Sequence, residues 1–497
     1  MRGSKVAVIF GLKVHRLRAE RGYGLKELSS RAGLSPSYLT EIEKGRKYPK
    51  ADKVMQLADA LDTTYDELVS LKLGDDLDPL ESLLDSPLVE VLPLGMFGLA
   101  PSDIVDLITR APHEASAFIR TLADIAGSYD VHVEHFLYSM LRSYQETHDN
   151  YFPDIESAVA RFAEGHGWNS APLVPYDALV EALEADFGIT VEEDGLAPYP
   201  DLSGFRSVWI AGARQRLLLN PKLSQRQKAF QIGREIGYRD LKLKQRGVTS
   251  SRAEAGSFEQ VLNDFKASYY AGALLIPQDE LTRDLTGFFA RDAWDGQLFL
   301  AMMNRYGVTP EMFLYRLTQI VPKRFGLKQF HFLRVSHDVA AGRFQITKHF
   351  KMSGLLMPLG QGWHEHYCRR WLAVALLNTL GGNDTAGSEA PVIAAQRSQL
   401  IGRDASYFVI TLARPLALTP GTHTSVTLGF QITPEFESVV RFCNDPAVPS
   451  LEINETCERC PLSPEECHER VAPPILHDQK IAQDERNQAL AQLLAEH

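Results

Sequence analysis

The feature that most restricts how this chain can fold is a pair of short helices that the sequence predicts within residues 11–61. Leu25, Leu28 and Ala32 recur at the spacing of one helix face, which predicts a short amphipathic helix. Gly33 follows directly and permits the backbone conformation that a tight turn requires. This part of the chain is therefore expected to turn back on itself as an all-α domain.

A second helix is predicted after that turn. Ser35 is a suitable N-cap, and Pro36 suits the first helical turn. Leu39 and Ile42 would point inward, and Gly45 is expected to end the helix. The polar residues on the N-terminal half of this helix then face outward, which is where helix-turn-helix motifs meet base edges.

The segment SYLTEIEKGRKYP, residues 37–49, resembles the Xre/Cro family of helix-turn-helix proteins. The resemblance implies binding to double-stranded DNA, and it implies that Glu43 pairs with Arg18 of the preceding helix. The family usually opens the first helix of the motif with a polar cap and a phosphate-binding Gln, but Gly24 and Leu25 stand there.

Lys26 is predicted to take over that phosphate contact. Ser37, Thr40 and Glu41 are predicted to read bases, and the basic residues to hold phosphates. The complete set of predicted DNA-binding residues is Lys26, Ser35, Pro36, Ser37, Tyr38, Thr40, Glu41, Lys44, Arg46 and Lys47.

Charge is distributed unevenly along the chain. The net charge is −11, but residues 1–50 carry 12 Lys and Arg against 4 Asp and Glu, which leaves −19 on the rest. A basic module on an acidic body is what local phosphate binding requires. No stretch reaches the apolar length of a membrane span, and five cysteines do not suggest a secreted disulfide scaffold, so we expect a cytoplasmic protein without a membrane partner.

The fold class predicted from these patterns is a multidomain α+β protein. It would have an N-terminal helix-turn-helix, a helical middle region, a degenerate zincin-like α+β domain and a GAF/PAS-like sensor with a cysteine cluster. The predicted boundaries are 1–75, 84–165 (a possible dimerisation region), 170–325, 330–475 and a C-terminal helix over 476–497.

The third region resembles the ImmA/IrrE metallopeptidase domain, where a helix carries His-Glu-x-x-His and binds zinc. In this chain the matching residues are Arg234, Glu235 and Tyr238. Arginine and tyrosine replace both histidine ligands, and without zinc no water is activated. The sequence therefore predicts a scaffold without peptidase activity.

The whole chain resembles the short-chain fatty acyl-responsive transcriptional regulators. The residues that carry this are NDFKASYYAGALLIP (263–277), TPEMFLYRLTQIVPKRFGLKQFHFLRV (309–335) and TCERCPLSPEECHERVAPP (456–474). The resemblance covers residues 1–80 and about 170–475. It implies a transcription factor that binds a short-chain acyl-CoA.

Four of the five cysteines form a cluster near the C-terminus, spaced C-x13-C-x2-C-x6-C: Cys443, Cys457, Cys460 and Cys467. Four thiolates fit either zinc or an iron–sulfur cluster. The family resemblance favours a [4Fe–4S] cluster, and zinc is the alternative. The fifth cysteine, Cys368, is predicted to lie in a helix far upstream.

The segment 330–433 resembles a GAF- or PAS-like sensor domain, in which a sheet covered by a helix leaves an apolar cavity for a small ligand. An acyl-CoA would also need cations for its phosphates. Arg334, Lys348 and Arg414 are the predicted ligand-binding cations.

The sequence thus favours a ligand-responsive transcription factor, a homodimer or homotetramer on a pseudo-palindromic operator. Two alternatives stay open. One is an ImmA/IrrE-type peptidase-related protein that acts on a partner repressor, and the other is a phage- or antitoxin-type repressor.

Overall fold

A computed structural model describes residues 2–43, 45, 47–70, 133–168, 173–212, 214–249, 257–352, 365–382 and 391–496. The chain divides into two compact units, one containing the N-terminal helices and the other containing most of the chain from Arg142 onward. The predicted helical region 84–165 is described only from residue 133, so its earlier part lies outside the described residues.

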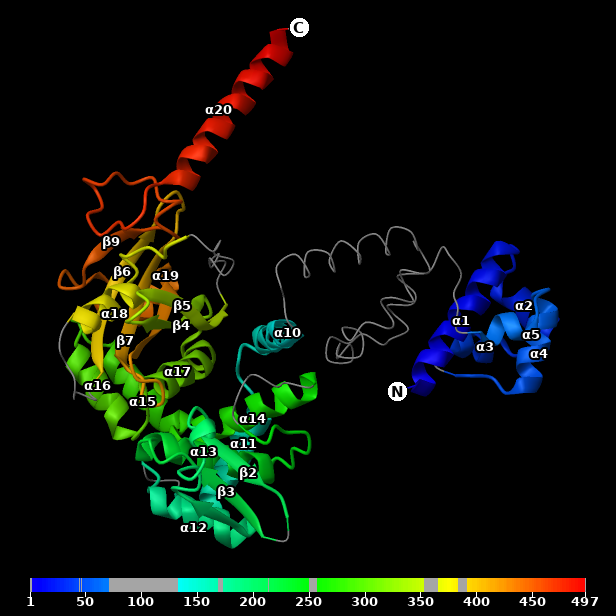
Figure 1. The fold of residues 1–497 in the computed structure, drawn as a ribbon, viewed down its shortest axis with the longest axis horizontal. Helices are drawn as coiled ribbons and strands as arrows, with labels where there is room; N and C mark the ends of the chain where they lie inside the picture. Colours follow the sequence, from blue (N-terminus) through cyan, green and yellow to red (C-terminus); the bar gives the residue numbers. More distant parts are fainter. Residues whose placement is uncertain are drawn as a thin grey trace. The chain divides into compact units, whose positions relative to one another are not determined.

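The first unit begins with five helices, shown in blue in Figure 1: α1 (Arg2–Glu20), α2 (Leu25–Ala32), α3 (Pro36–Glu43), α4 (Ala51–Ala60) and α5 (Tyr65–Val69). Their apolar faces meet in one core that includes Leu28, Leu39, Ile42 and Leu57, all fully buried. The predicted pair of helices is confirmed as α2 and α3. Gly33 ends α2 with φ 63°, the left-handed conformation that favours glycine.

Helices α1 and α3 approach each other unusually closely at Gly11. A Cβ atom at this position would collide with the carbonyl oxygen of Ile42 and would lie 2.8 Å from that of Glu43. Only the absence of a side chain allows the two backbones to pack at this distance.

Helix α10 (Val133–Thr147) begins in the first unit and ends in the second, which continues with α11 (Pro153–Gly165) and α12 (Tyr176–Phe187). A small sheet follows, built from β1 (Ile189–Glu192), β2 (Ser207–Ile210) and β3 (Gln215–Leu219), with the 3-10 turn η3 (Pro200–Leu202) before β2. Strand β3 is central, parallel to β1 and antiparallel to β2. Strands β2 and β3 therefore form a hairpin.

Five helices continue from this sheet: α13 (Gln225–Asp240), α14 (Phe258–Leu275), α15 (Gln278–Phe289), α16 (Gly296–Arg305) and α17 (Pro310–Phe325). Helix α13 has a capping box, in which Ser224 and Gln227 each bind the other's backbone N–H. This helix is buried along most of its length, so its polar residues need partners within the protein.

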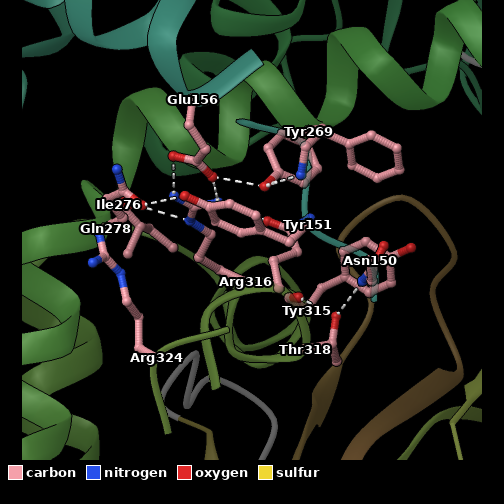
Figure 2. Close-up of polar contacts among 12 residues, drawn as sticks. Asn150, Tyr151, Glu156, Tyr269, Ile276, Gln278, Tyr315, Arg316, Thr318 and Arg324 are labelled. Carbon is pink, nitrogen blue, oxygen red and sulfur yellow. Dashed lines mark hydrogen bonds and ion pairs between the residues drawn. The ribbon is translucent and has the colours of Figure 1, made fainter. Parts of the chain in front are cut away.

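A buried ion pair joins α11 to α17, and Figure 2 shows its contacts. The Arg316 guanidinium donates to both carboxylate oxygens of Glu156, at 2.6 and 3.0 Å. It also donates to the carbonyl oxygen of Ile276 at 3.1 Å and to Gln319 at 2.9 Å. Tyr269 of α14 donates its hydroxyl to Glu156 at 2.7 Å. Three helices are thus tied to one buried carboxylate.

The C-terminal part of this unit is built on a six-stranded sheet: β4 (Phe330–Asp338), β5 (Arg343–Lys351), β6 (Val392–Leu400), β7 (Ser406–Pro415), β8 (Thr422–Gln431) and β9 (Ser450–Ile453). Their spatial order is β5-β4-β8-β7-β6-β9. Strands β5 to β6 in this order are antiparallel, and β9 runs parallel to β6. Helix α18 (Leu372–Gly382) packs on β7 and β8.

The chain ends with α19 (Pro434–Val439), the 3-10 turn η5 (Arg441–Asn444) and α20 (Ile475–Glu496). Helix α20 extends from the sheet as one long exposed element, drawn in red in Figure 1. In the parts of the chain that the structure describes, no helix is both long and apolar enough to cross a membrane.

The coarse prediction of a multidomain α+β chain is confirmed, and two local predictions need correction. Strand β6 was not predicted, because buried Gln396 and Ser398 interrupt its apolar pattern. Cys368 does not lie in a helix, since α18 begins only at Leu372. The assignment as a GAF/PAS-like sensor stays a prediction, and so do the domain boundaries.

Candidate functional site

The helix-turn-helix holds its second helix, α3, through a buried ion pair. Arg18 of α1 donates to both carboxylate oxygens of Glu43, at 2.6 and 2.9 Å. Two parallel hydrogen bonds to one carboxylate fix orientation as well as distance. The pair that the family resemblance implied is therefore present.

The turn before α3 is fixed by the predicted cap. The backbone N–H of Tyr38 donates to the Ser35 hydroxyl at 3.2 Å, and the buried Ser29 hydroxyl donates to the carbonyl oxygen of Leu34. Thr40 donates its hydroxyl to the carbonyl oxygen of Pro36 at 2.9 Å. Its oxygen lone pairs and its methyl group are then what Thr40 can offer to a base edge.

The predicted DNA-binding residues that the structure describes lie at the outer side of α2, α3 and their flanks. Lys26, Ser35, Pro36, Ser37 and Lys47 are exposed. Tyr38, Thr40 and Glu41 are half-buried, and the Lys47 ammonium lies 5.9 Å from the centre of the Tyr38 ring. Lys44 and Arg46 lie outside the described residues. Their contacts with DNA stay predictions.

Arg234 and Tyr238, which the sequence comparison predicts to stand at zinc-ligand positions, both bind Asp264 of α14. The Arg234 guanidinium and the Tyr238 hydroxyl donate to the same carboxylate oxygen of Asp264, the hydroxyl at 2.7 Å. Burial raises the pKa of Tyr238, and the Asp264 carboxylate raises it further, so the phenol keeps its proton. The arrangement joins α13 to α14 without a metal.

Glu235, the residue that survives from the metallopeptidase motif, is also engaged. Its Oε1 accepts from Arg239 at 3.0 Å and from Arg246 at 2.7 Å, and its side chain is 2% exposed. The guanidinium of Arg246 stacks over the rings of Trp209 and Tyr238, at 4.5 and 4.1 Å from their centres. Trp209, Arg246 and Asp264 were not predicted; only Asp264 falls in a segment that carried the family resemblance.

The outer strand of the small sheet is covered by the chain itself. The backbone N–H of Trp209 in β2 donates to the carbonyl oxygen of Val248 at 3.0 Å, and Val208 pairs antiparallel with Thr249. An extended peptide commonly binds by adding a strand to such an edge. Here residues 248–249 occupy the edge beside Glu235.

A cavity lies between the larger sheet and the start of α18. It measures about 50 Å³ and is lined mainly by apolar side chains, including Leu333, Leu372 and Val409. Buried His331 faces this cavity as a polar group, and its Nδ1 has no hydrogen-bond partner in the described structure. Burial lowers the pKa of His331 to about 4, so the imidazole is neutral at pH 7.

The predicted ligand-binding cations do not line this cavity. Arg334 and Lys348 both bind Glu311 of α17, at 3.0 and 3.3 Å, and Lys348 lies 3.7 Å from the centre of the Tyr315 ring. Arg414 lies near the end of β7 and does not line the cavity either. The positions of charged residues along the sequence could not show that Glu311 binds two of the three predicted cations, Arg334 and Lys348.

The structure changes the predicted cysteine group. Cys443 lies in η5, buried, and the charges that influence its pKa are those of Glu437 and Arg397. Cys368 instead lies beside the Cys457–Cys460 pair, here called the knuckle. The backbone N–H of Cys368 donates to the carbonyl oxygen of Glu455 at 3.3 Å, and the backbone N–H of Cys457 donates to the carbonyl oxygen of His366 at 2.9 Å.

The thiols of this revised group influence one another. Burial raises the pKa of Cys368 to about 11, with smaller contributions from Cys457 and Cys460. Burial also raises the pKa of Cys467, and Cys460 adds to that shift. Arg470 holds the knuckle by donating to the carbonyl oxygens of Cys460 and Cys457, at 2.7 and 3.3 Å.

No three Cys, His, Asp or Glu side chains of the described residues lie close enough together to hold a metal ion. The metal-binding role of Cys443, Cys457, Cys460 and Cys467 stays a prediction. The thiols whose charges act on Cys368 are those of Cys457 and Cys460.

Models of known protein families match two parts of the chain, the N-terminal helices and the region around α13. A family model described as a helix-turn-helix domain matches residues 11–74, and one described as an IrrE N-terminal-like domain matches residues 184–318. The second match contains Arg234, Glu235, Tyr238 and Asp264.

Relatives are found for the N-terminal part. The chain is 37% identical over 62 residues to an uncharacterized HTH-type transcriptional regulator, y4dJ, of Sinorhizobium fredii, covering 12% of this chain and 80% of that protein. It is 36% identical over 62 residues to a second such regulator, YazB, of Bacillus subtilis, covering 12% of this chain and 90% of that protein. Among solved structures, a Mycobacterium tuberculosis transcriptional regulator matches with 21% identity and a TM-score of 0.48, over 68% of this chain and 93% of that one.

Proposed function

Because this chain belongs, through its N-terminal domain, to the helix-turn-helix transcriptional regulators, we propose that it binds a specific duplex DNA site under the control of a small ligand. The proposed ligand is a short-chain acyl-CoA, and the proposed operator is a pseudo-palindrome bound by a homodimer or homotetramer. The observation that carries the DNA-binding part is the outer face of α3, held in place by the Arg18–Glu43 pair.

The cavity beneath α18 supports the proposal of a small apolar ligand. Its volume of about 50 Å³ corresponds to roughly three or four water molecules, which suits an acyl chain of a few carbons. His331 is the one imidazole among the described lining residues. Because it is neutral, it can donate one hydrogen bond to an acceptor such as a thioester carbonyl. The nucleotide part of a CoA thioester would remain outside.

We propose that the IrrE-like domain has no peptidase activity and serves as a scaffold. Arg234 and Tyr238 stand where the ligands would be, and both are bound to Asp264. A guanidinium does not coordinate zinc, and Glu235 is held by two arginines rather than poised beside a water. Residues 248–249 also occupy the edge of β2 where an extended peptide could otherwise add a strand.

The first test is the binding of purified full-length protein to duplex DNA from the promoter of its own gene, measured by fluorescence anisotropy at moderate salt. We expect affinity at least about 10³-fold above that for random duplex. Thr40→Ala is expected to reduce this preference by about 1–3 kcal/mol, because Thr40 lies on the reading face. Equal affinity for both duplexes would refute the proposal.

Thr379→Ala is the matched control. Like Thr40, Thr379 is a helical threonine that donates to the carbonyl oxygen four residues earlier, but it lies in α18. In the same assay propionyl-CoA is expected to change the affinity for promoter DNA at least about fivefold. Val409→Phe, which fills the cavity, should remove this response and keep DNA binding. A response that persists in Val409→Phe would place the ligand elsewhere.

We also propose that the cysteine group binds a metal, a [4Fe–4S] cluster or zinc, through Cys368, Cys457, Cys460 and Cys467. Four thiols suit either group, although their side chains must draw together to bind it. The group adjoins the cavity, because Glu455 lines the cavity and accepts the backbone N–H of Cys368. Loss of the metal would then alter the position of Glu455 at the ligand site.

Comparison of two serine variants tests this assignment. Protein purified without oxygen is expected to contain iron and sulfide, or zinc, and Cys368→Ser is expected to lose most of that content. Cys443→Ser should keep it, because Cys443 lies apart in η5. The measurement is elemental and sulfide analysis with a visible absorption spectrum; loss in Cys443→Ser but not in Cys368→Ser would restore the predicted set.

A further inference from the structure

Three buried N–H groups without partners belong to side chains that line one small cavity at the former zinc position. They are Nε of Arg234, Nε of Arg246 and Nε1 of Trp209, and none has a hydrogen-bond partner within the described structure. Arg234 is 7% exposed, and its other nitrogens already bind Gln231 and Asp264. Burying a donor without a partner is unfavourable, so three at one cavity indicate that something accepts from them.

The chemistry of these groups restricts what can bind. Guanidinium and indole nitrogens only donate, so a bound group must be an acceptor. The charged side chains gathered here are three guanidinium groups, Arg234, Arg239 and Arg246, against two carboxylates, Glu235 and Asp264. Tyr238 stays neutral because burial raises its pKa. The cluster therefore carries one uncompensated positive charge.

The size of the cavity restricts the ligand further. Its volume is about 10 Å³, which is room for one water-sized atom or ion. Residues 248–249 cover the neighbouring edge of β2, so an acidic peptide cannot lie along the strand to reach it. A single water molecule, a small ion or one end of a small molecule fits, and the positive charge of the cluster favours an anion.

We propose that this cavity binds one small monovalent anion, either a halide ion or a carboxylate such as formate. The position of a metal cation in the related peptidases would thus hold an anion in this chain. The site lies within the IrrE-like domain and involves neither α3 nor the cavity beneath α18, so it goes beyond the proposed regulation by an acyl ligand and can fail independently of it.

Thermal unfolding of the full-length protein at constant ionic strength tests the proposal. Sodium gluconate, whose anion is too bulky for the cavity, is replaced stepwise by sodium chloride in one titration and by sodium formate in another. A ligand that binds only the folded state stabilises it by RT ln(1 + [L]/Kd), so Tm rises logarithmically once the anion concentration exceeds Kd, whereas general screening stays the same at constant ionic strength. A rise of Tm of this form in one titration or the other identifies which anion the site takes.

Trp209→Phe removes one donor and keeps an aromatic ring for the arginines to stack on, so the Kd fitted to the rise of Tm should increase about tenfold. Arg216→Gln is the control, since Arg216 is an exposed residue of the neighbouring β3. In crystals grown with sodium bromide, an anomalous peak is expected beside Arg234. No rise of Tm in either titration, or an unchanged Kd in Trp209→Phe together with an empty cavity in bromide, would overturn the proposal.

Discussion

Replacing Arg316 by methionine is expected to lower the free energy of unfolding of the second unit by about 3–5 kcal/mol. The substitution keeps most of the side-chain volume but leaves the Glu156 carboxylate buried without its charged partner; the exposed fractions of the two side chains are 0% and 6%. It also leaves the carbonyl oxygen of Ile276 without its donor. Urea denaturation followed by tryptophan fluorescence measures the change.

Arg283→Met is the control for this prediction. Arg283 also pairs with a glutamate, Glu280, but its side chain is 69% exposed, so its loss should cost less than about 1 kcal/mol. The double variant Glu156→Gln/Arg316→Met should be more stable than the sum of the single effects indicates, because no isolated buried charge remains. Similar losses for Arg283→Met and Arg316→Met would contradict the role of burial.

Gly11→Ala is expected to destabilise the helix-turn-helix by about 3 kcal/mol, the upper end for one inserted methyl group. The new Cβ would meet the carbonyl oxygens of Ile42 and Glu43, and backbone atoms cannot rotate away as a side chain can. Because α3 would be displaced from α1, affinity for promoter DNA should fall at least about tenfold. Circular dichroism melts and fluorescence anisotropy measure the two effects.

Gly24→Ala tests whether that effect is specific to the helix contact. Gly24 precedes α2 with φ −70°, and a Cβ there meets nothing within 4 Å. Alanine should therefore change stability by no more than about 1 kcal/mol. If both alanine variants bind DNA as the unmodified protein does, the close approach of α1 and α3 is not required for DNA binding.

The helix-turn-helix could be predicted because its signals are local. Gly33, Ser35 and Pro36 act within a few residues of their own positions, through backbone conformation and capping. Strand β6 could not, because the amide of Gln396 is satisfied by the carbonyl oxygen of Arg370 and by Ser398, and a partner 26 residues away leaves no mark on the local pattern.

The candidate sites show the same distinction. The loss of both zinc ligands could be predicted from the sequence, whereas the contact with Asp264 requires α13 and α14 to lie side by side. Cys368 stands 89 positions before Cys457 in the sequence, and the pairing of Tyr367 with Thr456 brings them together. Sequence spacing favoured Cys443 because it measured separation along the chain instead of in space.

The bond network of Arg234, Tyr238 and Asp264 also bears on how this protein would fare in a zinc-starved cell. A domain whose helices are joined through a metal loosens when chelators or starvation remove that metal. In this chain α13 and α14 are joined by side chains of the protein itself, through the contacts of Arg234 and Tyr238 with Asp264. We therefore expect this junction of the IrrE-like domain to keep its shape when zinc is withdrawn.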